Sequence, residues 1–250
     1  MMNDNHVGVI IIGDEILNGK RKDKHLTHVI KKLKQHGLSL AWCRYVSDNE
    51  KFLTQQLQQS QEEQLPVFCF GGIGATPDDT TRLAAANAFN IKLVRHPEAL
   101  ALIKEEFGTR AYPNRVLMAD LPDEAIIIPN AFNNIPGFTL FEHHFFPGFP
   151  QLAWPMLDWV IENYYPSNHE RENEESVRVF NIPESELFNM LEYFAEKYPK
   201  LKVFSLPSMT NTNSIELGFR GEGLAPSRAL NELVSNLKSR NITFISEQTA

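Results

Sequence analysis

A glycine-rich turn lies between a short apolar segment and an alanine-rich segment, and this order limits the possible folds more than any other feature of the chain. The turn is Gly71-Gly72-Ile73-Gly74, and Thr76, Asp78 and Asp79 follow it. Glycine adopts positive φ values and lets a bulky ligand approach the backbone. The free N–H groups at a helix start suit phosphate. Because carboxylates repel phosphate unless a divalent cation lies between them, the turn predicts a phosphate-bearing ligand with a metal beside it.

The residues after the glycines also have a purely structural interpretation. Thr76 is a good N-cap, Pro77 suits the first helical position, and Asp78 and Asp79 suit the first turn of a helix. Taken alone, these residues fit capping at least as well as catalysis. A plain cap does not need three glycines, so the preceding turn favours a ligand site.

Apolar periodicity predicts strands and helices in alternation over the first part of the chain. We expect strands at 7–12, 38–46, 67–70, 125–128 and 138–146, and helices at 23–35, 49–64, 78–89, 97–107 and 152–165. Alternation of this kind is typical of a mostly parallel, doubly wound sheet. Ligands bind such sheets at the carboxyl ends of the strands, so we expect the loops 13–19 and 71–79 to meet there.

The pattern changes after a polar, charged segment at 166–175, which we interpret as a linker. Beyond it we expect strands at 176–180, 201–205, 214–220 and 242–245 and helices at 184–198 and 226–240. This order is β-α-β-β-α-β, the split βαβ arrangement. The sequence thus predicts a first domain at 1–165 and a small α+β domain at 176–250.

The composition excludes several functional classes. A net charge of −7 argues against a general nucleic-acid binder, and the second domain has no aromatic RNP-like strand. Cys43 and Cys69 lie in apolar runs and are expected to be buried thiols. The polar N-terminus is unlike a signal peptide, and no apolar run approaches about 20 residues. We therefore expect a cytoplasmic protein without a membrane span.

Three further motifs could contribute to a site. Gly13-Asp14-Glu15 follows the first strand, and two acids there could hold a cation or position a water, although ordinary turn chemistry also explains Gly13 and Asp14. Arg115, after Asn114, could bind phosphate or be a solvated surface charge. The turn Pro147-Gly148-Phe149-Pro150 follows a strand near the expected ligand edge. His143 and His144 are adjacent on a strand and point to opposite faces, so we treat them as structural.

Together these motifs resemble a known family. In order and spacing they are similar to the motifs of the molybdopterin-binding (MoaB/Mog-like) domain. The motifs that carry the resemblance are Gly13-Asp14-Glu15-Ile16-Leu17-Asn18-Gly19, Asp23, the glycine turn with Thr76 and Asp78-Asp79, Asn114-Arg115, Pro136-Gly137-Phe138 and Pro147-Gly148-Phe149-Pro150. The resemblance covers about residues 7–165 and is greatest to the CinA-like (competence/damage-inducible protein A) branch. The second domain resembles the small domain that follows in that branch. Full-length members carry a further C-terminal deamidase domain, which this sequence lacks.

The resemblance implies a three-layer α/β/α domain that binds molybdopterin or its adenylylated form. It also implies metal-dependent cleavage of ADP-ribose-type or FAD-type pyrophosphates with Mg²⁺, Mn²⁺ or Co²⁺. By position, Gly13, Asp14, Glu15 and Asp23 would line the pocket, Gly71, Gly72, Gly74 and Thr76 would cradle phosphate, and Asp78 or Asp79 would hold the metal. Asn114, Arg115, Pro147 and Gly148 would contact the ligand. A homo-oligomer is also expected.

This chain departs from the family pattern at three positions. Ala75 stands where the family usually has Pro, His25 where it usually has Asn, and Phe149 where it usually has a smaller aliphatic residue. The last two changes are expected to reshape the pocket and its choice of ligand. Two hypotheses follow: a metal-dependent nucleotide pyrophosphatase that uses Glu15, Asp78 and Asp79, and a molybdopterin- or nucleotide-binding module without turnover.

Overall fold

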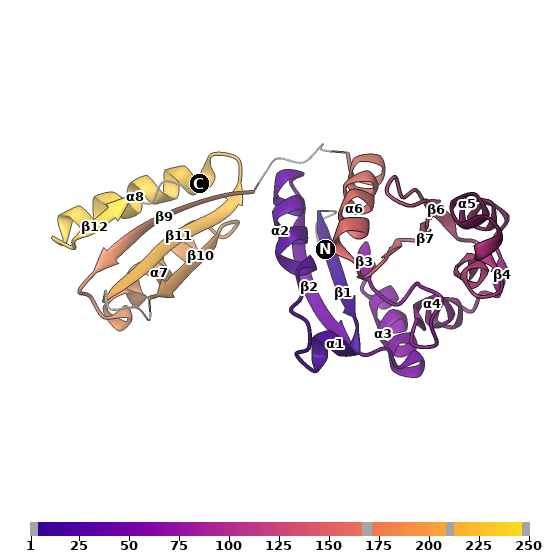
Figure 1. Cartoon of the computed structure of the whole chain (residues 1–250). Coiled ribbons are helices and arrows are strands. Elements are labelled where there is room, and N and C mark those ends of the chain that lie inside the picture. Colours follow the sequence, from indigo (N-terminus) through magenta and orange to yellow (C-terminus); the bar gives the residue numbers. More distant parts are fainter. Residues whose placement is uncertain (1–4, 167–171, 209–212, 247–250) are drawn as a thin grey trace. The chain divides into compact units, whose positions relative to one another are not determined.

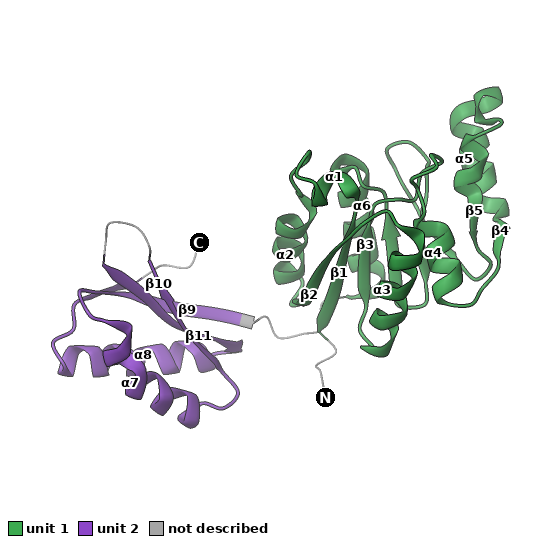
Figure 2. Ribbon diagram, turned by 90° about the horizontal axis from the view of Figure 1, so that it is seen from below, with its two compact units in different colours: residues 1–169 green, residues 170–250 purple. Residues whose placement is uncertain are grey.

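The computed structural model describes residues 5–166, 172–208 and 213–246. The chain divides into two compact units, Met1–His169 and Glu170–Ala250 (Figure 1, Figure 2). The second unit begins with strand β9 (Glu172–Phe180), which starts four residues earlier than the sequence pattern predicts. Its first residues are polar and charged, so hydrophobic alternation alone did not mark them as a strand. Part of the expected linker, 167–171, lies outside the described residues.

Unit 1 contains a six-stranded, mostly parallel sheet, as predicted. Its order is β2 (Ser39–Val46), β1 (His6–Ile12), β3 (Val67–Phe70), β8 (His143–Phe146), β7 (Gly137–Leu140) and β6 (Ile126–Ile128). The first four strands run parallel, and β7 pairs antiparallel with both β8 and β6. The carboxyl ends of β1, β3 and β8 therefore meet at one edge of the sheet.

One segment predicted as a single strand is a hairpin of two strands in the structure. The expected strand 138–146 is two strands, β7 and β8, joined by a turn at Phe141 and Glu142. Phe141 has φ 51°, and neither Gly nor Pro marks the turn in the sequence. The apolar residues on both sides of the turn concealed it, because a hairpin is normally recognised from its turn residues.

Helices cover both faces of this sheet and bury two separate cores. Leu53 and Leu57 of α3 (Glu50–Glu62) and Ala84 and Ala85 of α4 (Thr81–Ala88) pack in one core with Ile10 and Phe145. Val29 of α2 (His25–Gln35) and Leu157 of α6 (Pro150–Tyr164) pack in the other with Val9 and Phe146. Successive β1 residues alternate between the two cores, as a strand buried on both faces must. Figure 2 shows the sheet between α2 and the pair α3 and α4.

Two short regions complete unit 1. The one-turn helix α1 (Asp14–Leu17) follows β1 directly. A small two-stranded sheet of β4 (Leu93–Arg95) and β5 (Asp120–Pro122) lies with α5 (Pro97–Phe107) and the 3₁₀ turns Gly108–Ala111 and Arg115–Ala119. The sequence pattern predicted α5 but neither strand of this sheet, since each strand has three residues.

Unit 2 has the predicted β-α-β-β-α-β order. Its antiparallel sheet runs β10 (Lys202–Pro207), β11 (Ser214–Glu222), β9, β12 (Phe244–Ser246). Helices α7 (Glu184–Lys197) and α8 (Ala225–Ser239) supply Leu187, Phe194 and Leu233 to a core of its own. Across the described part of both units, no helix combines the length and the apolar character that a membrane span requires.

Candidate functional site

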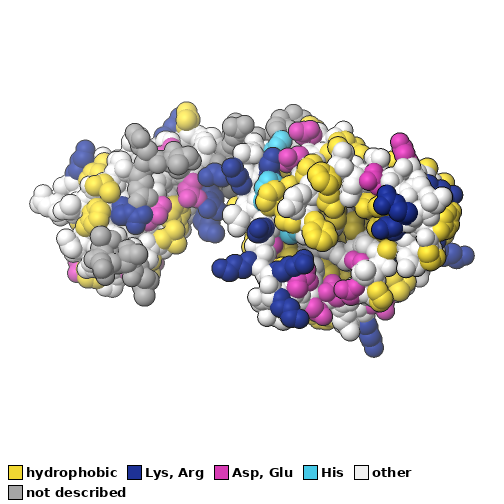
Figure 3. Space-filling model, in the orientation of Figure 1, with side chains coloured by type: hydrophobic (Ala, Val, Ile, Leu, Met, Phe, Trp, Pro, Cys, Tyr) yellow, Lys and Arg dark blue, Asp and Glu magenta, His cyan; other side chains and the backbone are white. Residues whose placement is uncertain are grey.

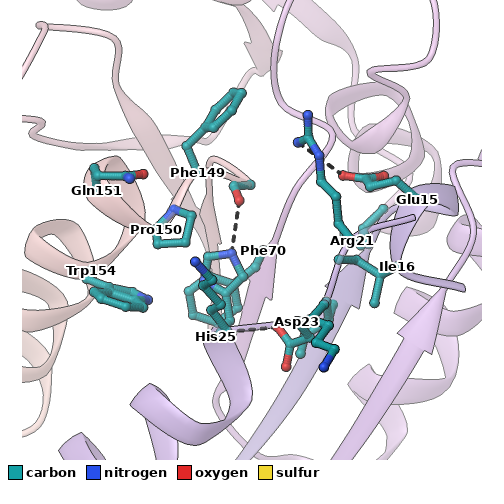
Figure 4. Close-up of a pocket in the computed structure, with 15 residues that line it drawn as sticks. Glu15, Ile16, Arg21, Asp23, His25, Phe70, Phe149, Pro150, Gln151 and Trp154 are labelled. Carbon is teal, nitrogen blue, oxygen red and sulfur yellow. Dashed lines mark hydrogen bonds and ion pairs between the residues drawn. The ribbon is translucent and has the colours of Figure 1, made fainter. Parts of the chain in front are cut away.

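A cavity of about 540 Å³ opens at the carboxyl ends of β1 and β3. Figure 4 shows the segment with Glu15, Arg21 and Asp23 on one side and the start of α6 on the other. His25 and Phe70 lie between the two sides. This volume and position are typical of small-molecule sites in α/β proteins.

His25 and Phe70 form the floor of this pocket. Their rings stack with centroids 4.6 Å apart, and His25 is only 5% exposed. Nε2 of His25 lies 3.0 Å from the carbonyl oxygen of Gly148, to which it donates. The bond joins the start of α2 to the turn before α6. Burial lowers the pKa of His25, so its ring is neutral at pH 7.

Aromatic side chains on α6 form one wall. Phe149 precedes the helix and is 58% exposed, and Trp154 lies one turn further on. The Trp154 ring stacks on His28 at 4.0 Å, and its Nε1 donor is buried without a hydrogen-bond partner. A buried donor without a partner is costly, and because the atom is buried, a ligand in the pocket meets the ring of Trp154 and not this donor.

Positive charge lies on the opposite wall. Arg21, Lys22 and Lys24 line the pocket together with the carboxylates of Glu15 and Asp23. Figure 3 shows basic and acidic side chains interspersed over the surface around α1. The N-terminus of α6 also opens here, because Pro150 and Gln151 are lining residues. Its positive dipole end and the three cations favour an anionic ligand.

The two acids of this wall have different roles. Asp23 accepts hydrogen bonds from the backbone N–H groups of His25 at 2.8 Å and Leu26 at 3.1 Å, and from the Tyr45 hydroxyl at 3.1 Å. It therefore fixes the start of α2. Glu15 lies 3.9 Å from Arg21, and both side chains are well exposed. Such an exposed pair contributes little to stability and leaves Arg21 able to turn towards a ligand.

The glycine turn packs against its own surroundings and not against the cavity. A Cβ on Gly71, whose φ is 111°, would lie 2.3 Å from the Ile12 carbonyl oxygen, and one on Gly72 would lie 2.3 Å from Oγ1 of Thr81. At Gly74 a Cβ would meet the Asp79 carboxylate at 2.4 Å. Residues 71–79 are all described, and none of them lines the 540 Å³ cavity. Close internal packing and positive φ are therefore sufficient reason for Gly71 and Gly72, whereas the neighbour of Gly74 is the end of the flexible Asp79 side chain.

The acids after the glycines are engaged locally or are fully exposed. The backbone N–H and the hydroxyl of Thr76 donate to the Asp79 carboxylate at 2.8 and 2.5 Å. A hydrogen bond from Thr76 lowers the pKa of the exposed Asp78. Helix α4 begins at Thr81 with Thr80 as its N-cap residue, so the predicted helix start at 78 and the capping role of Thr76 were wrong. Thr76 and Asp79 instead close a separate turn.

Asp48 is an acid at this edge that sequence reasoning missed. The backbone N–H of Asp14 donates to Asp48 at 2.8 Å, and that of Asp48 donates to Asp14 at 3.3 Å. Burial raises the pKa of Asp48, and the negative charges of Asp14, Glu15 and Asp78 raise it further. The sequence could have indicated it, because Asp48 comes two residues after the expected strand at 38–46 and so lies, like Asp14, at the carboxyl ends of the strands.

These acids do not form a ready metal site. Within the described part of the chain, no group of three or more His, Cys, Asp or Glu side chains is placed to hold a metal ion. Asp79 is already bound to Thr76, and Asp14 and Asp48 bind each other's backbone. The arrangement therefore does not fit the metal that the resemblance implies.

The remaining predicted ligand residues divide into two groups. Gly148, which follows Pro147, lines the pocket. Arg115 donates to the Arg110 carbonyl oxygen at 2.7 Å and lies 4.6 Å over the Phe107 ring, and neither it nor the exposed Asn114 lines the pocket. Sequence reasoning also missed Arg82, which is buried and donates to the carbonyl oxygens of Gly74, Leu117 and Asp120. A single Arg within the alanine-rich helix was its only signal.

Comparison with known proteins identifies the family of unit 1. Residues 8–166 match the family described as the probable molybdopterin-binding domain. The chain belongs to this family. Within the family it falls on the CinA-like branch, as predicted, because the chain is 30% identical over 192 residues to the CinA-like protein of Syntrophotalea carbinolica, covering 72% of this chain and 46% of that protein.

Two further proteins are similar to this chain over different lengths. A solved structure of the protein CinA from Thermoplasma acidophilum aligns with a TM-score of 0.59 at 26% identity, over 63% of this chain and 98% of that one. A protein of Pyrobaculum calidifontis is 27% identical over 93% of this chain and 95% of its own length. The chain spans about half the length of the CinA-like relatives it matches.

We expect Gly71→Ala to destabilise unit 1 more than Gly19→Ala does. Both glycines have positive φ, but a Cβ on Gly19 meets nothing within 4 Å, whereas one on Gly71 meets a backbone carbonyl. A positive φ costs about 1–2 kcal/mol for alanine, and overpacking adds about 1–3 kcal/mol at Gly71. Urea unfolding followed by tryptophan fluorescence measures this, because Trp42, Trp154 and Trp159 all lie in unit 1. Equal losses would contradict the packing role of Gly71.

We also expect Asp48→Asn to stabilise the protein at pH 7. The raised pKa means that the charged form of Asp48 is disfavoured in the fold, so its ionisation removes stability as pH rises through its pKa. Asparagine keeps an acceptor for the Asp14 N–H and removes the charge. The advantage of the variant should disappear below the ordinary aspartate pKa of 3.8, which urea unfolding at pH 7 and at low pH tests. A variant that is less stable at pH 7 would exclude charge repulsion as the cause.

Proposed function

We propose that unit 1 binds a planar heterocycle that carries phosphate, either a pterin such as molybdopterin or an adenine nucleotide, in the 540 Å³ pocket. The observation that carries the proposal is the composition of the two walls. One wall is aromatic and consists of Phe149 and Trp154. The other carries Arg21, Lys22 and Lys24.

The aromatic wall suits the ring of such a ligand. Phe149 and Trp154 offer ring faces and edges, and offset or edge-to-face contacts between rings contribute about 0.5–1.5 kcal/mol each. His25 keeps the floor rigid through its bond to Gly148.

The basic wall suits the phosphate. Guanidinium and ammonium groups form charge-assisted hydrogen bonds with phosphate oxygens, and the start of α6 adds its dipole. In this account the ligand is held without a metal ion, and the pocket is a binding module. The poor fit of the described acids to a metal supports binding without turnover.

Metal-dependent cleavage of a pyrophosphate is the second candidate. The observation that favours it is the crowding of Asp14, Glu15 and Asp48: burial raises the pKa of Asp48, and the charges of Asp14 and Glu15 raise it further. A divalent cation relieves repulsion of this kind. Among the residues that the structure describes, however, these acids do not form a metal site.

We expect calorimetry to detect binding of ADP, and the double variant Arg21→Ala/Lys22→Ala to bind ADP about tenfold more weakly, the effect of one or two charge-assisted contacts. Lys34→Ala is the matched control, because Lys34 is exposed on α2 and does not line the pocket. Excess EDTA should leave the affinity unchanged. Absence of any binding of ADP or molybdopterin would refute the proposal.

The second candidate is tested with ADP-ribose or FAD and added Mg²⁺, Mn²⁺ or Co²⁺. If the pocket only binds, no product forms above the level of the Glu15→Gln and Asp78→Ala/Asp79→Ala variants. Turnover that depends on both metal and these carboxylates would establish the hydrolase and contradict a module without turnover.

A further inference from the structure

Positive charge is concentrated in one segment of unit 1. Residues 20–36 contain seven Lys or Arg residues and one acid, Asp23, whereas the whole chain has a net charge of −7. The net charge led us to expect no general binder of nucleic acid, but it averages over an uneven distribution. In Figure 3 several Lys and Arg side chains lie over the part of unit 1 where Figure 1 draws α2.

Four of these cations form a basic face that begins at the pocket. Lys22 and Lys24 line the pocket, and Lys31 and Lys34 follow on α2. Positions 24, 31 and 34 lie on one side of a helix, because their spacing repeats with its turn. All four lysines are exposed. At a rise of about 1.5 Å per residue, the face extends about 15 Å along the helix from Lys24 to Lys34.

Nearby acids do not neutralise the basic face. Asp23 accepts hydrogen bonds from two backbone N–H groups and the Tyr45 hydroxyl, and Asp158 is paired with Lys32 at 2.8 Å. Among the residues that the structure describes, none of the four lysines of the face forms a salt bridge. A row of cations without counter-charges attracts a chain of anions.

The surroundings of the basic face select among polyanions. Along α2, all of which the structure describes, Ile30 is the one large apolar side chain that is exposed, so the helix lacks the apolar stripe that a membrane-surface helix inserts. At the pocket end, Phe149 and Trp154 offer rings on which a base can stack. Both features fit a row of phosphates that ends in an unpaired base.

We propose that unit 1 binds the end of a single-stranded nucleic acid, with the terminal base between Phe149 and Trp154 and the next phosphates along the basic face. This inference rests on the proposed function, because the terminal nucleotide occupies the same pocket. It goes further in naming the ligand class, since the phosphates beyond the first nucleotide lie on Lys31 and Lys34, outside the pocket.

A matched pair of probes on the full chain isolates the basic face. One is deoxyadenosine monophosphate, and the other is a strand of one deoxyadenosine followed by abasic nucleotides. Both have one base, and only the strand has further phosphates. Strands with the base at the 5′ or the 3′ end are both measured by calorimetry, and the tighter one is compared. We expect it to bind at least tenfold more tightly than the monophosphate at low salt. This gain should shrink with salt by about 0.7 logarithmic units per phosphate contact for each tenfold rise.

A variant pair assigns the gain to α2. Lys31→Ala/Lys34→Ala should remove most of it and leave the affinity for ADP unchanged, because neither lysine lines the pocket. Lys51→Ala/Lys92→Ala is the control, since it removes the same charge from exposed positions outside the pocket. This control should keep both affinities. Equal losses in the two variants would overturn the role of the basic face.

The remaining outcomes separate this inference from the proposed function. Binding of ADP without any gain for the strand would overturn this inference alone, whereas no binding of either would also refute the proposed function. Equally tight binding of a fully abasic strand or of a DNA duplex would show that no unpaired terminal base is recognised. Equally tight binding of vesicles of phosphatidylserine and phosphatidylcholine would assign the face to a membrane surface. Each of these results would overturn the proposal.

Discussion

One hydrogen bond holds the two sides of the candidate pocket together at its floor. Nε2 of His25 donates to the carbonyl oxygen of Gly148, and the two residues are 123 positions apart in the chain. The bond joins the first residue of α2 to the turn that begins α6, while the His25 ring rests on Phe70 at the end of β3. This hydrogen bond fixes the distance between the aromatic wall on α6 and the basic wall before α2. The shape of the pocket between the two walls therefore depends on it.

His25 and Phe149, two positions at which this chain departs from the family pattern, both lie in the pocket. Asparagine, which the resemblance leads one to expect at position 25, has no ring to stack on Phe70. An imidazole fills the floor, and Phe149 adds an exposed ring at the rim. Both departures increase the aromatic surface of the pocket, whereas the acids nearby stay tied to local backbone groups. These contacts support our proposal that the pocket binds its ligand through stacking and phosphate contacts.

The sequence was sufficient for the fold, because each element has a local signal. The apolar run of β1 and the helical spacing of α2 and α3, in alternation along the chain, predicted a mostly parallel sheet. The β7–β8 turn, the starts of β9 and α4 and short strands such as β4 were missed. The site was harder to predict because its contacts are long-range. Gly71 faces the Ile12 carbonyl oxygen, Asp48 faces Asp14, and Trp154 reaches the pocket from α6. No local pattern reports such contacts, so the packing of Gly71 against Ile12 could not be predicted from the sequence, and the phosphate-binding role of the glycine turn stays a prediction.

A crystal structure of the full chain with ADP tests the central claim most directly. The account predicts density for the adenine ring between Phe149 and Trp154, and density for the phosphates beside Arg21 and Lys22. No cation should be needed to hold them. Phosphate density cradled by residues 71–79 with a metal on Asp78 or Asp79 would contradict the account and restore the assignment made from the family resemblance.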